Sequence, residues 1–475
     1  MKLKLVKIGD FPADLTDLSS RLQKVFGWKV ESGTGLNPNP DDYRPGRGQY
    51  WAVPVLKDLA ALYPGEPVLG VAQAGFYEAG LASVQGIHLE KGSSALVTLS
   101  GLKSEDAGLL NSRLWKLAAR QIAAWLDLPP CRNCLLSPLA DPGELDLLPE
   151  DFCPQCLEKL RGLSLPSFAP YPAKSLKFIY HPDFYADLAG HVFPVEKYAA
   201  LYQKLRDEGL GEEDFLIPPA ATREELAWVH TPEYLEDLFN YRFTPRTISS
   251  ELLLNRKILR AFCLMAGGSQ LGAQTALENG AALALGGGFH HAFADHAEGF
   301  CYLNDPAFAL KSLQAAGKIQ RAAVIDCDVH QGNGTAVIFQ GDPAVFTFSI
   351  HQENLYPPKR QSSLDIGLED GLGDEEYLSR LRKSIPAILE FFAPQLAVYL
   401  AGADPYKDDQ LGGLQLTLDG LRERDELVLG RCFHKRIPVL TLLAGGYARN
   451  FADTVQIHLN TAGLMRRIFG KVSSS

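Results

Sequence analysis

The stretch RAAVIDCDVHQGNGT, residues 321–335, decides the fold class, because an apolar segment within it ends in charged side chains. Residues 322–325 are all apolar and predict a buried strand, and Asp326, Asp328 and His330 follow at alternate positions. Alternate side chains of an extended segment face the same side, so these three groups should converge. A buried carboxylate is costly unless it is paired or bound to a metal. The stretch therefore predicts a functional site at the end of a buried strand, with a solvated turn as the alternative.

The composition is that of a globular protein with two or three domains. The chain has 475 residues, of which 46% are hydrophobic and 21% are charged. No apolar run approaches the roughly 18 to 20 residues that cross a bilayer, and the N-terminus, MKLKLVKIGDF, lacks the apolar region of a signal peptide. We therefore expect a cytoplasmic protein with no membrane partner. A net charge of -10 without a basic stripe argues against nucleic acid as a partner and leaves a basic protein substrate open.

A proline-rich segment predicts the domain boundary. The segment LSLPSFAPYPAK, residues 163–174, contains three prolines and has no helical or strand period, so it predicts a linker. Residues 1–162 show short apolar strands and an amphipathic helix over 114–128, ended by two prolines, which indicates a small α/β domain. In residues 175–475 strands alternate with helices, which predicts an α/β fold with a mostly parallel sheet flanked by helices.

The predicted sheet places its polar residues at one edge. In open parallel sheets the site lies at the carboxyl ends of the strands. The predicted strands are 176–181, 282–288, 321–329, 345–351, 396–404 and 439–447, and the predicted helices lie near 194–209, 257–279, 305–316, 374–392 and 418–434. Histidines and carboxylates follow these strands, whereas only His88 of the eleven histidines lies in the first 173 residues. Chemistry that needs imidazole is therefore expected in the second domain.

Asp328, His330 and Asp404 form a candidate metal site. Two carboxylates and one imidazole suit a catalytic zinc, which takes three protein ligands and keeps a position open for water. The neighbouring pair His290 and His291 could transfer protons. A tyrosine in the glycine-rich segment AGGYAR, residues 444–449, could donate a hydrogen bond to a developing oxyanion. Together these groups indicate metal-assisted hydrolysis.

Five motifs of the second domain resemble, in order, those of the histone deacetylase family. They are GGGFHHAFADHAEGFCYLND, DCDVHQGNGT, FSIHQENLYP, LAGADPYKDDQLGGLQLT and LLAGGYA. The likeness covers roughly residues 176–470 and is closest to the branch that includes class IV deacetylases and their bacterial relatives. It implies the arginase-deacetylase fold and a zinc-dependent deacylase that hydrolyses the amide of acyl-lysine or a related acylated amine.

The resemblance also implies the roles of individual residues. Asp328, His330 and Asp404 are implied to bind the catalytic Zn²⁺, and Tyr447 to polarise the scissile carbonyl.

The two histidines have separate implied roles. His291 is implied to be the general base, with His290 as its electrostatic partner, and Asp326 and Asn333 are implied to orient them.

The substrate tunnel and a second cation site are implied in the same way. Gly299 and Phe300 would line a narrow tunnel for an acyl-lysine chain, with Tyr356 as the opposite wall. A structural monovalent cation, K⁺ or Na⁺, is implied at Asp326, Asp328, His330, Ser349 and Ile350.

The first domain contains two CxxC units and a second resemblance. CRNC at 131–134 and CPQC at 153–156 predict a structural zinc site with four ligands, Cys131, Cys134, Cys153 and Cys156. Residues 1–160 are similar to archaemetzincins, whose active helix carries HExxHxxGxxHC. The positions matched to the first histidine, the glutamate, the second histidine, the glycine and the third histidine are Arg120, Gln121, Ala124, Asp127 and Pro130. This resemblance implies a catalytically inactive scaffold or substrate-recognition domain.

Two alternative functions stay open, and a third is disfavoured. The protein could be an amidohydrolase of acetylpolyamines or other small acylated amines, or a non-catalytic binding protein. A binuclear manganese hydrolase of the arginase type is disfavoured, because the additional aspartate ligands it needs are replaced by Asn333 and Gln331. The sequence does not predict an oligomeric state.

Overall fold

A computed structural model describes most of the chain as two compact units. The described residues are 2–12, 14–79, 81, 83–89, 92–102, 104–132, 134–139, 141–161, 163 and 175–470. The division between the units falls between residues 163 and 175. The predicted linker, residues 163–174, lies outside the described residues apart from Leu163.

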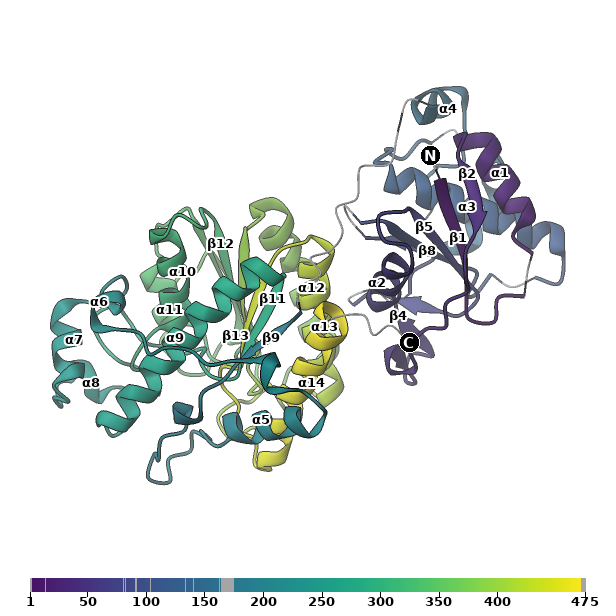
Figure 1. The fold of residues 1–475 in the computed structure, drawn as a ribbon. Helices are drawn as coiled ribbons and strands as arrows, with labels where there is room; N and C mark the ends of the chain where they lie inside the picture. Colours follow the sequence, from purple (N-terminus) through teal and green to yellow (C-terminus); the bar gives the residue numbers. More distant parts are fainter. Residues whose placement is uncertain are drawn as a thin grey trace. The chain divides into compact units, whose positions relative to one another are not determined.

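The first unit is a small α/β domain built on a five-stranded sheet (Figure 1). The sheet order is β2 (Lys29–Ser32), β1 (Lys2–Ile8), β5 (Val68–Ala72), β8 (Ser94–Thr98) and β7 (Gly86–His88). Its neighbours are parallel except for the antiparallel pair β7 and β8. A small second sheet contains β3 (Tyr43–Arg44), β4 (Gln49–Trp51) and β6 (Phe76–Tyr77). The helices are α1 (Thr16–Phe26), α2 (Ala52–Leu62), α3 (Ala107–Trp125) and α4 (Pro154–Arg161).

The bounds predicted for α3 are wrong at both ends. The helix begins at Ala107 because the Asp106 carboxylate caps it, accepting hydrogen bonds from the amides of Gly108 and Leu109. It ends at Trp125, before the two prolines, and Asp127 then has a left-handed backbone with a φ of 56°.

The second unit is built on an eight-stranded sheet in which every neighbouring pair is parallel. The sheet order is β10 (Phe215–Leu216), β9 (Lys177–Ile179), β11 (Ala281–Ala284), β16 (Val439–Leu442), β15 (Leu396–Leu400), β12 (Ala322–Asp326), β13 (Val345–Gln352) and β14 (Leu364–Leu368). The predicted parallel sheet is therefore confirmed. The edge strands β10 and β14 were not predicted, because most of their residues are half-buried and lack a continuous buried apolar run.

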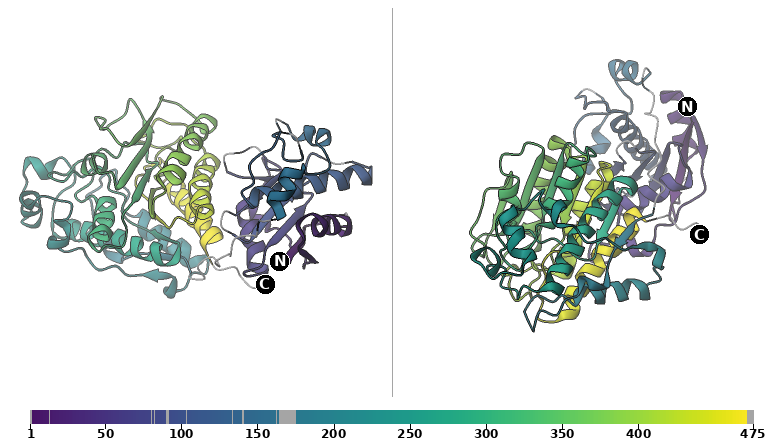
Figure 2. Two further views of the ribbon diagram at one scale, coloured as in Figure 1. Left: turned by 90° about the horizontal axis from the view of Figure 1, so that it is seen from above. Right: turned by 60° about the vertical axis from the view of Figure 1, so that its left-hand side comes forward.

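Helices cover both faces of this sheet (Figures 1 and 2). One layer contains α9 (Arg256–Asn279) and α10 (Asp305–Ala315), and the other contains α12 (Asp374–Pro386), α13 (Leu418–His434) and α14 (Phe451–Phe469). The helix predicted to reach residue 392 continues after Pro386 as a π-helix over Ala387–Phe392, where the proline provides no amide donor. The remaining helices are α5 (Lys197–Asp207), α6 (Arg223–Leu226), α7 (Pro232–Phe239), α8 (Pro245–Ile248) and α11 (Asn333–Ile338).

Within the described part of the chain, no helix combines the length and the apolar composition of a membrane span.

Candidate active site

The candidate site lies at the carboxyl ends of the four central strands of the second unit. The chain makes these strands in the order β11, β12, β15 and β16, but the sheet arranges them as β11, β16, β15 and β12. Because the strands are parallel, the segments that follow them meet at one edge of the sheet. Those segments carry the predicted site residues His290, His291, Asp328, His330, Asp404 and Tyr447, and the predicted residue Asp326 is the last residue of β12.

Three of these residues form a cluster that could hold a metal ion. Asp328, His330 and Asp404 are buried, and one ligand atom from each lies within 4.8 Å of the others. His330 Nδ1 is 3.1 Å from Asp328 Oδ1 and 3.3 Å from Asp404 Oδ2. Asp404 Oδ2 is buried and accepts no hydrogen bond from the described residues. A buried carboxylate oxygen without a donor, beside a second carboxylate and an imidazole, fits a divalent cation with mixed oxygen and nitrogen ligands.

Backbone amides hold the two carboxylates in place. Asp404 Oδ1 accepts from the amide of Val329 at 2.9 Å. Asp328 Oδ1 accepts from the amide of His330 at 3.0 Å, and Asp328 Oδ2 accepts from the amide of Gly445 at 2.8 Å. The loops after three different strands are therefore connected through the cluster itself, which positions the ligand atoms before any ion binds.

The two adjacent histidines have different partners. His290 Nδ1 lies 2.6 Å from Asp326 Oδ2, and His291 Nδ1 lies 2.8 Å from Asn333 Oδ1. Burial lowers the pKa of His290, but Asp326 and Asp328 outweigh burial and raise it to about 9. Burial, with the nearby His290 and His330, holds the pKa of His291 well below its ordinary value. The pKa of His290 is thus raised and that of His291 lowered, the division expected for an electrostatic partner and a proton acceptor.

Tyr447 is held through its backbone. Its amide donates to Asp409 Oδ2 at 2.6 Å, and its carbonyl accepts from Gln410 Nε2 at 2.9 Å. The side chain is buried, and its ring packs near Phe193 and Phe300, with centroids 6.2 and 6.1 Å away. The hydroxyl-bearing side chain lines the same pocket as the metal cluster.

A pocket of about 270 Å³ leads to the cluster. Its walls combine the predicted residues Gly299, Phe300 and Tyr356 with two apolar side chains, Leu355 and Leu411. Gly299 has a φ of +49°, and a Cβ at this position would lie 2.6 Å from the His291 ring and 3.0 Å from the Tyr356 hydroxyl. Only glycine fits this close approach, so the pocket is narrow between Gly299, His291 and Tyr356.

The predicted monovalent-cation residues lie on two neighbouring strands, β12 and β13, or directly after β12. The register of β12 and β13 pairs Asp326 with Ser349. Ser349 Oγ lies 2.9 Å from His351 Nδ1, and both side chains are buried. Asp328 and His330 follow β12, and Ile350 follows Ser349 within β13.

The structure also places together polar residues that motif reasoning missed. Asp409 accepts from the amides of Leu411 and Gly412 as well as that of Tyr447, and so organises the Tyr447 loop. Lys197, fully buried on α5, donates to the carbonyl oxygen of Ala444 at 2.5 Å. Burial lowers the pKa of Lys197 to about 8, although Asp404, Asp328 and Asp409 act to raise it. Hydrophobic periodicity in the sequence does not identify these residues, because their roles depend on partners that lie elsewhere in the chain.

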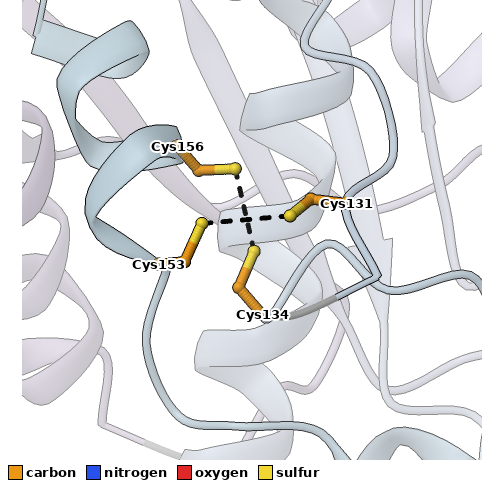
Figure 3. Close-up of side chains that lie close together, drawn as sticks. All are labelled: Cys131, Cys134, Cys153 and Cys156. Carbon is orange, nitrogen blue, oxygen red and sulfur yellow. Dashed lines mark hydrogen bonds between the residues drawn. The ribbon is translucent and has the colours of Figure 1, made fainter.

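In the first unit the four predicted cysteines converge (Figure 3). The Sγ atoms of Cys131 and Cys153 are 3.9 Å apart, and those of Cys134 and Cys156 are 3.8 Å apart. A tetrahedron with zinc–sulfur bonds of about 2.3 Å has sulfur–sulfur edges of about 3.8 Å. The sulfur positions therefore fit a closed zinc site.

The positions matched to protease ligands have other contacts. Arg120 Nη1 donates to the carbonyl oxygens of Leu135 and Ser137 at 2.6 and 2.7 Å, so it ties α3 to the segment after the first CxxC unit. Gln121 Nε2 lies 2.7 Å from Nδ1 of His88, a histidine that is distant in sequence but adjacent in space. Ala124 provides no ligand, and among the described residues this region forms no metal-binding cluster.

Comparisons with known proteins agree with this geometry. The sequence matches the family model of the histone deacetylase domain over residues 191–462. An uncharacterized protein of Picosynechococcus is 40% identical over 284 residues, which cover 59% of this chain and 95% of that protein. Histone deacetylase 2 of Arabidopsis thaliana is 30% identical over 333 residues, covering 66% of this chain and 86% of the relative. The crystal structure of the HDA15 HD domain has a TM-score of 0.53 and 24% identity, covering 63% of this chain and 91% of that domain, a likeness of fold.

Proposed function

Because the chain belongs to the histone deacetylase family, we propose that it is a zinc-dependent deacylase acting on acyl-lysine or a related acylated amine. One observation carries the proposal. The pocket leads to a buried cluster of two carboxylates and an imidazole. The two histidines, of which His290 is paired with Asp326, and Tyr447 line the same pocket.

The catalytic zinc would be held by Asp328, His330 and Asp404. When bound, zinc supplies a Lewis acid and lowers the pKa of water. His291 would accept the proton of the attacking water and return it to the leaving amine, since burial lowers its pKa and its Nδ1 faces Asn333.

The other two side chains would stabilise charge. The His290 imidazolium, paired with Asp326, provides a positive field beside the reacting groups. The Tyr447 hydroxyl would donate to the carbonyl oxygen as negative charge develops on it, and its buried position keeps the hydroxyl protonated.

Two further assignments belong to this proposal. A monovalent cation, K⁺ or Na⁺, would bind near the β12 and β13 pair through groups of Asp326, Asp328, His330, Ser349 and Ile350. The class IV and bacterial branch would be the nearest relatives, which rests on the stretch HQENLYPPKRQSSLDIGLEDGLGDEEYL, residues 351–378.

The first unit would be an inactive archaemetzincin-like domain that binds a structural zinc. Two observations support this assignment. The cysteine sulfurs have the spacing of a tetrahedral site, and Asp127, matched to the motif glycine, has the left-handed backbone that glycine favours. Arg120 replaces a metal ligand by hydrogen bonds to two carbonyl groups, so this domain would serve as a scaffold or in substrate recognition.

A substrate screen tests the proposed activity. Purified full-length protein loaded with zinc is expected to release the acid from acetyl-lysine peptides, and parallel assays with long-chain acyl peptides and acetylpolyamines would define the amine and acyl preferences. Turnover of acetylpolyamines alone would make the protein a small-molecule amidohydrolase. No turnover of any of the three classes, with the catalytic zinc bound, would contradict the proposal and favour a binding protein.

A mutation that removes one of the two zinc sites is expected to leave the other site intact. The wild-type chain should contain about two zinc ions, and Cys131→Ser with Cys134→Ser should reduce this to about one. The first unit should lose stability, because the binding energy of a structural zinc is also folding energy. Deacylase activity should persist, since the second unit has its own core and its own ligands. Metal analysis, thermal unfolding and turnover measure these effects, with Cys263→Ala, a buried cysteine outside the cluster, as the control.

A further inference from the structure

Glu298 connects the proton-accepting histidine to the wall of the pocket. Its Oε1 accepts from Asn333 Nδ2 at 2.8 Å and from the Tyr356 hydroxyl at 3.0 Å. On the other side of Asn333, Oδ1 lies 2.8 Å from His291 Nδ1. A continuous chain of hydrogen bonds thus runs from His291 through Asn333 and Glu298 to Tyr356.

The carboxylate determines which way the Asn333 amide faces. An asparagine amide has one donor end and one acceptor end, and either end could face an imidazole. An ionised carboxylate only accepts, so Glu298 attracts Nδ2 and thereby directs Oδ1 toward His291. The amide of Gly334 also donates to Oδ1, at 2.9 Å. His291 must then carry its proton on Nδ1, which leaves Nε2 as the proton acceptor.

Glu298 has the surroundings that keep it ionised. Burial raises its pKa, but hydrogen bonds from His296, Asn333 and Tyr356 outweigh burial and hold the pKa below its ordinary value. The same carboxylate fixes the Tyr356 hydroxyl, and the Tyr356 ring centroid lies 5.5 Å from that of His291. One side chain therefore acts on both the catalytic histidine and the pocket wall.

We propose that Glu298 is a positioning residue that orients the Asn333 amide, and through it the tautomer of His291, while its second hydrogen bond holds Tyr356 as a fixed wall. The kinetic consequences rest on the proposed deacylase function, whereas the orientation of the amide and the tautomer do not.

An exchange of the two side-chain types tests the orientation. Asn333→Asp alone places two carboxylates in contact and should lower kcat by about 10-fold or more, the range seen when residues supporting metal-site histidines are changed. Glu298→Gln alone removes the acceptor-only partner and leaves the amide of Gly334 as the remaining group that directs Oδ1 toward His291, so the orientational preference of the Asn333 amide weakens. The double variant again pairs a donor with an acceptor: the glutamine at position 298 can donate to the aspartate at position 333, and that aspartate accepts from His291. We expect the double variant to recover to within about 3-fold of wild-type kcat.

A neighbouring carboxylate provides the matched control. Asp295 is exposed in the same loop and contacts His296 rather than Asn333 or Tyr356. Asp295→Ala should leave kcat and KM unchanged. Tyr356→Phe removes the hydroxyl bonded to Glu298 but leaves Asn333 in place, so it should change the preference among acyl chain lengths and leave the His291 tautomer unaltered.

Imidazole ¹⁵N spectra of the full-length protein report the tautomer without any substrate. We expect wild type and the exchanged double variant to show His291 protonated on Nδ1, and Glu298→Ala to show a mixture of tautomers. An unchanged tautomer in Glu298→Ala, or no recovery of kcat in the double variant when its fold is intact, would overturn the inference. If the spectra change as expected while the wild type hydrolyses no acylated amine, the positioning role stands and the deacylase proposal fails.

Discussion

Replacing Asp404 by alanine is expected to remove the catalytic zinc and to reduce deacylase activity below detection. Asp404 would supply one of only three protein ligands, and its Oδ2 accepts no hydrogen bond among the described residues. The substitution also removes the acceptor for the amide of Val329, which costs about 1–3 kcal/mol in stability. Metal analysis and turnover on the substrate found in the screen measure the result.

Two further variants separate loss of the ligand from loss of the fold. Asp404→Asn keeps an acceptor for the Val329 amide, so it should fold like wild type but bind zinc much more weakly. Asp408→Ala removes an exposed carboxylate from the same loop and should retain both zinc and activity. Wild-type turnover by metal-free Asp404→Ala protein would refute the assignment of the metal site.

Replacing Tyr447 by phenylalanine is expected to lower kcat by about 10²- to 10³-fold, the effect of removing one donor to a developing oxyanion. The zinc content should not change, because the hydroxyl is not part of the metal cluster. KM should change little, since the ring still fills its place beside Phe193 and Phe300. Steady-state kinetics and metal analysis of the same preparation check both expectations.

A hydroxyl outside the pocket serves as the comparison for Tyr447. Tyr406 is also buried, and its hydroxyl lies 3.4 Å from Asp453 rather than in the pocket. Tyr406→Phe should therefore leave kcat near the wild-type value. Equal kcat values for Tyr447→Phe and the wild type would show that Tyr447 only shapes the turn and that it takes no part in the chemistry.

Local patterns predicted most of the central strands of the second unit. Residues 322–325 are all apolar and lie in β12, but this strand spans only Ala322–Asp326 and is shorter than the predicted 321–329, which included polar residues that follow it. Predictions failed where local signals were weak or overridden. The strand β14 lies at an edge and is half-buried, and the start of α3 depends on the capping carboxylate of Asp106 rather than on apolar periodicity.

The sequence by itself determined which side chains follow each central strand, because a short apolar run and the polar residues after it can be recognised from neighbouring residues alone. Asp328 and His330 at the end of β12 are the clearest case. Only the tertiary structure decided which strand ends are neighbours. It places β16 beside β11 and β15 beside β12, and so brings Asp404 into the cluster with Asp328 and His330 and Tyr447 into the pocket that leads to it.

Partners distant in sequence were likewise decided by the tertiary structure alone. Glu298 meets Asn333 and Tyr356, and Lys197 meets the carbonyl of Ala444, across long stretches of chain. Such pairs depend on strand order and loop path, which hydrophobic periodicity does not encode. Buried polar groups of each loop need hydrogen-bond partners, and the packing of the sheet brings those partners close. For this reason the contacts that position the site residues are evident only in the folded protein.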